Sequence, residues 1–343
     1  METKIKNTTV YEKSDYREIF DVAENESRLK VYIKSYLNIY DVPVIDEAVI
    51  EKEEFCASKF TFYVLKDDLV SFNQGDAVSV KFDSAGIFYG YVFSKARDKE
   101  NLIKVVCYDQ MRYLKNRRTY TRGSMCLEEI VRRIGNDNAL RIGETDQAAG
   151  LLPPVAADNL SLLDVIKKAC KEQRRLNGER YILYDDFGYL NLKNEKNLET
   201  NVMIDATGAE NYVYTDTIDK DVYNTVQLYS DTKKANLRSL TTITDKETAN
   251  MWGTLILSKK ASDPLRAYEE ARELLAEYNK INRTITLKCV KGDLRFVPGC
   301  SVYVKLSMGD LYFDNFVRVR KAVHRFKNNM YSADLYLDGS EIE

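Results

Sequence analysis

Residues 60–82 read FTFYVLKDDLVSFNQGDAVSVKF, and residues 285–306 read ITLKCVKGDLRFVPGCSVYVKL. A single one-residue gap aligns the two stretches, and the apolar positions of alternating strands then coincide. The matched residues are Phe60 with Ile285, Phe62 with Leu287, Val64 with Cys289, Asp68-Leu69 with Asp293-Leu294, Phe72 with Phe296, Gly75 with Gly299, and Val78, Val80 and Phe82 with Val302, Val304 and Leu306. Alternation around a glycine turn is common and can arise by chance, but here the Asp-Leu, Phe and Gly landmarks share one order. The sequence therefore predicts a duplicated β-module. Because two similar modules in one polypeptide can occupy two similar places in a ring, this favours an assembly component over an enzyme.

The composition is that of an ordinary globular protein. The chain has 343 residues, which is typical of two or three domains, and a formal net charge of −2 with both signs spread along it. No basic patch marks a nucleic-acid partner, and we expect no sequence-specific nucleic-acid binding. The sequence shows no signal peptide and no long apolar run, so we also expect no membrane partner.

The six cysteines, at positions 56, 107, 126, 170, 289 and 300, include no CxxC pair. Most lie in alternating strands or on helix faces. This placement predicts buried, reduced thiols and synthesis in a cytoplasm.

The pattern of strands and helices divides the chain into four parts. An N-terminal arm (1–28) has little pattern, and a first β-domain (29–117) has the strand pattern of an antiparallel barrel or sandwich. Its predicted strands are 29–35, 44–52, 55–65, 77–82, 86–96 and 102–108. A middle α+β domain (118–206) and a second β-domain (207–343) follow.

The middle domain is predicted from helix caps and a hairpin. Ser124 is a candidate N-cap for a helix that closes at Gly135, and Ser161 begins a helix that ends near Asn177-Gly178. A hairpin spans residues 181–192. The second β-domain has predicted strands at 224–229, 240–244, 253–258, 311–323 and 330–337, besides those of the repeat. It also has a helical insertion near 263–282 that begins at Asp263-Pro264.

Few residues invite a chemical role. His324 is the only histidine, and we expect it at a surface or interface of its strand, because no nucleophile and orienting acid accompany it. The acid pairs Asp67-Asp68 and Asp185-Asp186 sit near strand ends, where Asp commonly forms turns. The aromatic run Phe88-Tyr89 with Tyr91 could line a carbohydrate or nucleic-acid groove, but packing and subunit contact are favoured. We predict no catalytic, cofactor-binding or metal-binding residue.

Several longer stretches resemble the XkdQ/YqbQ family of phage-tail proteins. They are 86–98, 105–116, 158–166, 181–192, 219–228 with Tyr223-Asn224, and Trp252-Gly253. The likeness runs from about residue 28 to residue 340. This family resembles the baseplate hub proteins of contractile tails, which are related to the late control protein D group and to the hub of the T4-type baseplate.

The resemblance implies a fold and a set of partners. The expected fold class is α+β and mainly β, with two similar antiparallel tube-type β-barrels, a middle α+β domain and a helical insertion in the second barrel. The expected assembly is a homotrimer whose six barrels form a pseudo-sixfold ring between the tail tube and the central spike. Implied partners are the tail tube or tube-initiator protein, the spike, other baseplate proteins and the tape measure protein. The expected location is the baseplate of a virion or tail-like particle, of a phage or a bacteriocin, after synthesis in the bacterial cytoplasm.

Two other functions stay open at this point. One is a peptidoglycan-degrading tail component, for which no acid–base pair is visible. The other is a carbohydrate-binding host-adhesion protein, which the tyrosine-rich strands allow.

Overall fold

The computed structural model describes residues 10–11, 28–66, 70–99, 101–231, 238–309 and 311–339. The fold is mainly β with large antiparallel sheets, as predicted. Two compact units are present. One contains the described residues up to Tyr212 and those of Thr286–Leu337, and the other contains the described residues of Val213–Ile285 with Asp338 and Gly339. Most of the predicted arm (1–28) lies outside the described residues, as do Asp67, Asp68 and Leu69.

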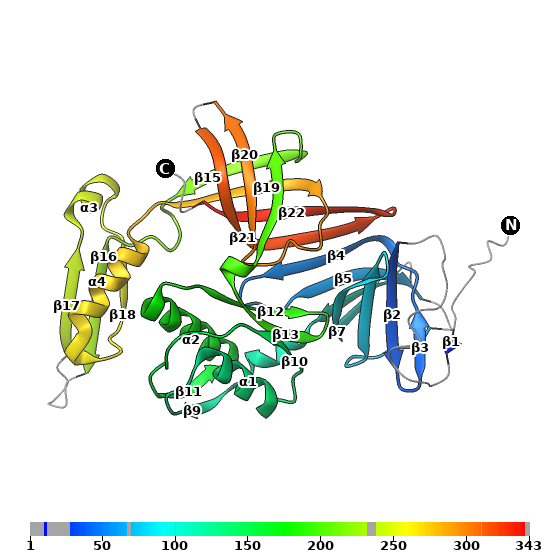
Figure 1. The fold of residues 1–343 in the computed structure, drawn as a ribbon, viewed down its shortest axis with the longest axis horizontal. Coiled ribbons are helices and arrows are strands. Elements are labelled where there is room, and N and C mark those ends of the chain that lie inside the picture. Colours follow the sequence, from blue (N-terminus) through cyan, green and yellow to red (C-terminus); the bar gives the residue numbers. More distant parts are fainter. Residues whose placement is uncertain are drawn as a thin grey trace. The chain divides into compact units, whose positions relative to one another are not determined.

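The first β-module is a curled antiparallel sheet with the strand order β1-β3-β2-β6-β7-β8-β5-β4 (Figure 1). Val31 on β2 and Ile50 on β4 have four strands between them, yet both belong to one hydrophobic cluster with Phe60. A sheet whose distant strands share one core must curl around it. The strands are β1 (Val10–Tyr11), β2 (Leu29–Ser35), β3 (Asn38–Asp41), β4 (Ile45–Glu53), β5 (Lys59–Leu65), β6 (Ala77–Phe82), β7 (Ala85–Arg97) and β8 (Leu102–Tyr108).

The second β-module repeats the four central strands of the first. The strands β20, β21, β22 and β19 lie in the same order as β6, β7, β8 and β5, with β14 beside β20 and β15 beside β19. Their bounds are β14 (Glu199–Asp205), β15 (Asn211–Thr217), β19 (Asn282–Lys291), β20 (Ser301–Met308), β21 (Leu311–Lys327) and β22 (Met330–Asp338).

The repeat extends to the hydrogen bonds of the turn before β6 and β20. Gly75 (φ 90°) and Gly299 (φ 86°) both adopt the left-handed conformation that favours glycine. The Gly75 N–H donates to the carbonyl of Val92 at 2.8 Å, and the Gly299 N–H donates to the carbonyl of Val319 at 2.8 Å. Strand β7 shifts its register with β8 directly after Val92, and β21 shifts its register with β22 directly after Val319. The same irregularities at matched positions confirm the two similar modules that the sequence predicted.

One matched pair of the predicted repeat was wrong. Val64 is buried, but its predicted counterpart Cys289 is exposed and has a φ of 52°. The inward alternation of β19 shifts by one residue at Cys289, so that Val290 enters the core instead. The outer strands also differ between the modules, because β2 pairs antiparallel with β6 whereas β14 pairs parallel with β20.

The middle segment (109–197) folds around its own hydrophobic cluster, to which Leu127 and Ile130 of α1 and Leu162 and Ile166 of α2 contribute. Ser161 accepts a hydrogen bond from the backbone N–H of Asp164, and Gly178 (φ 78°) ends α2, as predicted. The elements are η2 (Gln110–Lys115), β9 (Arg117–Arg122), α1 (Leu127–Asp137), β10 (Ile142–Thr145), β11 (Val155–Ser161), α2 (Leu162–Asn177), β12 (Tyr181–Asp186), β13 (Tyr189–Asn194) and η3 (Glu195–Asn197).

Both boundaries of the middle segment differ from the predicted 118–206. Met111 and Leu114 of η2 are buried in the middle cluster, so the segment begins before residue 118. Strand β14 pairs with β20 and therefore belongs to the second module. A hydrophobic turn directly before a strand is a weak sequence signal, and a parallel partner about a hundred residues away gives none.

The limits of α1 were also predicted incorrectly. The N-cap is Cys126 rather than Ser124, and Gly135 lies inside the helix instead of ending it. A Cβ atom at position 135 would lie 2.1 Å from Cδ1 of Ile142. Gly135 therefore allows β10 to approach the helix closely, which is a packing role rather than a capping role.

The helix predicted near 263–282 belongs to a larger inserted segment. Strands β16 (Thr225–Asp231), β17 (Arg238–Thr244) and β18 (Ile256–Lys260) form a separate three-stranded sheet. The helix α4 (Ala267–Tyr278) packs on it, with Ala271 and Leu274 in one cluster with Val226 and Leu228. The segment also contains α3 (Lys246–Trp252) and η4 (Pro264–Arg266), and Asp263 caps η4 rather than α4. The predicted strands 224–229, 240–244 and 253–258 therefore lie outside the second module's sheet, because the apolar face of α4 needs a sheet of its own.

Candidate functional site: the junction between the two modules

The two modules are joined edge to edge by β4 and β21, which lie side by side in Figure 1. The first half of β21 pairs with β20, and its second half pairs antiparallel with β4 from Lys321–Glu53 to Lys327–Glu47. One continuous sheet of 14 strands results. The junction is therefore a β-ladder between two copies of the same module, within one chain.

Opposite charges line this ladder. Glu51 on β4 binds Lys321 on β21 at 3.0 Å and Lys59 on β5 at 2.9 Å. Burial opposes the ionisation of Glu51, but the hydrogen bonds from the two lysines outweigh burial and lower its pKa. Arg325 binds Glu47 at 3.2 Å and Asp334 at 3.2 Å. An acidic strand thus meets a basic strand, which specifies the partner and the register.

Arg318 connects three parts of the chain. Its Nε atom lies 2.6 Å from Glu195 of η3, and its Nη2 atom binds Glu54 at the end of β4. The side chain is only 17% exposed, so both carboxylates are neutralised away from bulk water. This ion-pair network holds β21 against the first module and the middle segment together.

His324 lies inside the junction. Of the two positions expected for it, the interface is the one found and the surface was wrong. Its side chain is only 3% exposed because β4 covers this part of β21, with His324 opposite Ile50. Its Nδ1 atom lies 2.7 Å from the hydroxyl of Tyr331. Burial, with a smaller effect of Lys52, lowers the pKa of His324 to about 3. The histidine is a neutral core residue at neutral pH.

Two buried carboxylates connect the first module to the middle segment. Asp109 accepts hydrogen bonds from the backbone N–H groups of Ser58 (2.8 Å) and Met111 (2.9 Å). Asp185 accepts from the Gln110 side chain (2.9 Å) and from the backbone N–H of Gly188 (2.8 Å). Burial raises the pKa of Asp109 to about 6, and burial and the nearby Asp109 raise the pKa of Asp185 well above its usual range. Backbone N–H groups and the Gln110 side chain donate to these carboxylates. The bond from Gly188 agrees with the turn role predicted for Asp185-Asp186.

The predicted aromatic run packs within the chain. Phe88 is buried, whereas Tyr89 contacts Phe187 edge-on at 6.1 Å and Tyr91 contacts Tyr113 edge-on at 5.7 Å. The guanidinium of Arg141 lies 5.6 Å from the centre of the Tyr89 ring. These rings border a pocket of about 380 Å³. Because the rings contact one another and Arg141, they do not present the flat aromatic platform on which a sugar ring stacks.

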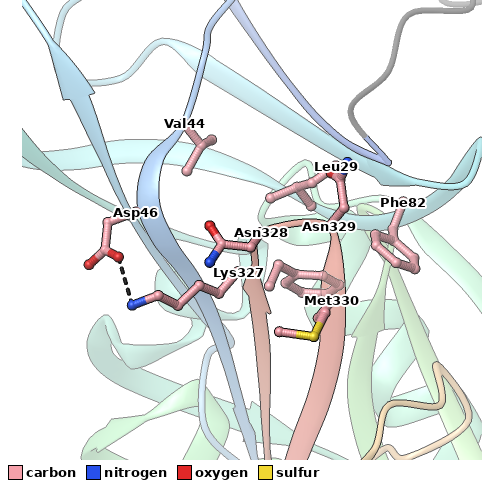
Figure 2. Close-up of a pocket in the computed structure, with 9 residues that line it drawn as sticks. Leu29, Val44, Asp46, Phe82, Lys327, Asn328, Asn329 and Met330 are labelled. Carbon is pink, nitrogen blue, oxygen red and sulfur yellow. Dashed lines mark ion pairs between the residues drawn. The ribbon is translucent and has the colours of Figure 1, made fainter.

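A second pocket, of about 410 Å³, lies where the turn between β21 and β22 meets the first module. Figure 2 shows Lys327 reaching Asp46, with 2.8 Å between Nζ and Oδ1. Asn328 (φ 50°) and Asn329 (φ 60°) form the two-residue turn. Arg28 donates to the carbonyl of Asn329 at 3.3 Å. The walls of this pocket therefore belong to contacts that hold the two modules together.

The cysteines and acids add no chemical centre in the part of the chain that the structure describes. All six thiols are free: Cys107, Cys170 and Cys300 are buried, Cys56 and Cys126 are half-buried, and Cys289 is exposed. No described group of three or more His, Cys, Asp or Glu residues is arranged to hold a metal ion. None of the described helices is long and apolar enough to span a membrane.

Residues 51–338 match the family described as YQBQ-like. The chain is also 27% identical over 252 residues to the phage-like element PBSX protein XkdQ of Bacillus subtilis (strain 168), covering 69% of this chain and 73% of that protein.

Two solved structures share the fold at low sequence identity. The 43 kDa tail protein of prophage MuSo2 from Shewanella oneidensis superimposes with a TM-score of 0.65 at 12% identity, over 90% of this chain and 98% of that chain. The Escherichia coli c3393 protein gives a TM-score of 0.53 at 10% identity, over 90% of this chain and 76% of that chain. It is described as a component of the type VI secretion system with structural similarity to the T4 bacteriophage tail proteins gp27 and gp5.

Proposed function

This chain belongs to the YQBQ-like family, and from that premise we propose that it is the structural baseplate hub of a phage tail or tail-like bacteriocin. The similarity to a protein of a phage-like element and the fold shared with a prophage tail protein support a place in a tail. Symmetric assembly, not turnover, is then the activity. We assign no residue a catalytic, cofactor-binding or metal-binding role.

In the proposed hub, three chains close a ring of six similar modules. The observation that carries this proposal is the β4–β21 ladder, in which two copies of one module already stand edge to edge. A sixfold tail tube and a threefold spike need an adapter whose subunit presents two equivalent walls, and a duplicated module meets that need. The proposed partners are the tail tube or its initiator, the central spike, other baseplate proteins and the tape measure protein, in an assembled virion or tail-like particle.

The mass of the particle in solution tests this proposal. Mass photometry and light scattering on the purified full chain, alone and mixed with the spike protein of its particle, should give three copies of the chain per complex. Electron microscopy of the complex should show a ring with six similar lobes. A monomer under both conditions would overturn the hub.

The two alternatives receive less support from the site. A peptidoglycan-degrading component needs two carboxylates facing a cleft, whereas Asp185 is buried and accepts hydrogen bonds from the Gln110 side chain and the Gly188 N–H. Glycan recognition needs free aromatic faces, whereas Tyr89 and Tyr91 are engaged within the chain. We therefore propose no enzymatic activity.

A further inference from the structure

We propose that the open edge of β7, from Ser94 to Arg97, is the docking strand for the β15 edge of a second copy of this chain. This inference rests on the proposed ring and names the surface through which its subunits join. It follows from comparing the same strand in the two modules, since one copy of the strand is paired on this side within the chain and no described strand pairs with the other.

The covered strand is β21 and its counterpart is β7. The turn hydrogen bonds and the register shift match Val92 to Val319, so Ala96 corresponds to Val323 and Arg97 to His324. In the second module, β4 pairs with this part of β21. In the first module, β6 pairs with β7 as far as Tyr91, and Gly75 and Asp76 of the preceding turn bond Val92. From Ser94 to Arg97, β8 is the only strand that pairs with β7 among the residues that the structure describes. No described strand therefore fills on β7 the place that β4 fills on β21.

The exposure of matched residues differs between β7 and β21. Ala96 and Arg97 are exposed, whereas their counterparts Val323 and His324 are buried where β4 pairs with β21. A pocket of about 310 Å³ borders this edge and is lined in part by Phe72, Lys95 and Arg97. Native proteins cover an exposed strand edge with a partner or protect it against uncontrolled pairing with other chains.

The backbone N–H and C=O groups on the open side of β7 are oriented to pair with another strand. The N–H of Asp98 donates to the carbonyl of Leu102 on the β8 side at 3.0 Å. Because successive residues of a strand direct their N–H and C=O groups to opposite sides, those of Arg97 and Lys95 face the open side. Their counterparts, His324 and Ala322, pair with Ile50 and Lys52 of β4.

The complementary edge is β15, which stands beside β19 as β4 stands beside β5 and ends the described strand order. The N–H of Glu210 donates to the carbonyl of Lys288 on β19. Lys288 is the counterpart of Tyr63 on β5, and Tyr63 pairs with Ile45, the first residue of β4. Residues at this edge are exposed, including Val213 at 47%.

The charges repeat the pattern of the internal junction. The open β7 edge carries Lys95 and Arg97, as β21 carries basic residues, and the β15 edge carries the exposed acids Glu210 and Asp216, as β4 carries acidic residues. Each chain therefore offers one basic edge and one acidic edge. Such a heterologous contact closes a ring when the rotation repeats, and the internal junction supplies alternate contacts of that ring.

Crosslinking between two singly labelled chains tests the pairing. Cys289 is first changed to Ser to remove the exposed native thiol. One chain then carries Ala96→Cys and the other Val213→Cys, and the mixture is treated with a short bismaleimide. We expect a crosslinked pair of chains, and crosslinked trimers when both substitutions are in one chain. The control pairs Ala96→Cys with Met203→Cys, which is 62% exposed on β14 at the opposite edge of the second module and should not crosslink.

A backbone substitution tests the same edge independently. Arg97→Pro removes an N–H that faces the open side and leaves the β7–β8 ladder intact, so the chain should fold with an unchanged circular dichroism spectrum but lose the ring. Ala96→Pro, which removes an N–H facing β8, should instead lower the melting temperature. If rings form but neither the crosslink nor the Arg97→Pro effect is seen, the β7–β15 pairing is wrong and the hub stands. If the unmodified chain forms no ring, the hub itself fails.

Discussion

His324 is the only histidine of the chain, and its position makes the module junction sensitive to acid. It is buried against Tyr331, with Lys52 and Asp293 as the charged groups that act on it. The pKa of this imidazole is about 3 in the folded chain, against an ordinary value of 6.5. Above pH 6.5 the residue is neutral in both the folded and unfolded states. As the pH falls below 6.5 the unfolded chain binds a proton that the folded chain does not, so stability is lost down to about pH 3.

Substituting the histidine should remove this part of the acid sensitivity. The native chain should lose about 2 kcal/mol of unfolding free energy from this group between pH 7.5 and pH 5, and His324→Gln should not. Urea unfolding at the two pH values gives the loss of unfolding free energy for each chain, and the two losses are then compared. Asp109, whose raised pKa acts in the opposite direction, is present in both chains and cancels. Equal pH dependence in the two chains would contradict a buried neutral imidazole.

The same glycine turn precedes β6 and β20, but the two turns pack against different surroundings. Both glycines have a positive φ, but a Cβ atom at position 75 meets nothing within 4 Å, whereas one at position 299 would lie 2.5 Å from Cγ1 of Ile182. Alanine should therefore cause the same backbone strain at both sites. The clash with the middle segment belongs to the second turn alone.

Alanine substitutions should separate these two costs. Gly75→Ala should lower the unfolding free energy by about 1 kcal/mol, because an L-residue is strained in the left-handed region. Gly299→Ala should lose about 2 kcal/mol more through overpacking against Ile182. Urea unfolding gives both values. In an Ile182→Ala background, Gly299→Ala should cost no more than Gly75→Ala does. Equal costs in the native background would show that the turn does not pack on β12.

Sequence patterns predicted the bounds of strands and helices better than they predicted which strands pair with one another. Strands β2, β6 and β8 have the predicted bounds, and α2 lies between the predicted caps Ser161 and Gly178, because alternation and capping are local signals. The β4–β21 ladder was not predicted, since residues such as Glu51 and Lys321 are separated by 270 positions. The choice between a surface and an interface position for His324 stayed open for the same reason, because burial by β4 is visible only once the partner strand is known. Complementary charge between 46–54 and 318–327 is the signal that could have indicated this junction.

At the scale of the whole molecule, the inserted segment is separable from the two-module unit. It has its own sheet and its own hydrophobic cluster. The side chain of Asn282 donates to the carbonyl of Lys220 at 2.5 Å, so the chain leaves and returns at one place. Insertions with adjacent ends are tolerated because their removal leaves the surrounding backbone unstretched.

Replacing residues 221–281 with a short Gly-Ser turn should therefore leave the rest of the chain folded. We expect the melting temperature to change by only a few degrees, and the ring to persist because β7 and β15 remain. Near-ultraviolet circular dichroism, calorimetry and mass photometry measure these outcomes. The matched deletion of α1, which removes the buried Leu127, Ile130 and Ile134, should abolish cooperative unfolding. If excising the insertion also abolished it, the two compact units would depend on each other for folding. If the excised chain folded but stayed monomeric, the inserted segment would contribute to the subunit contact.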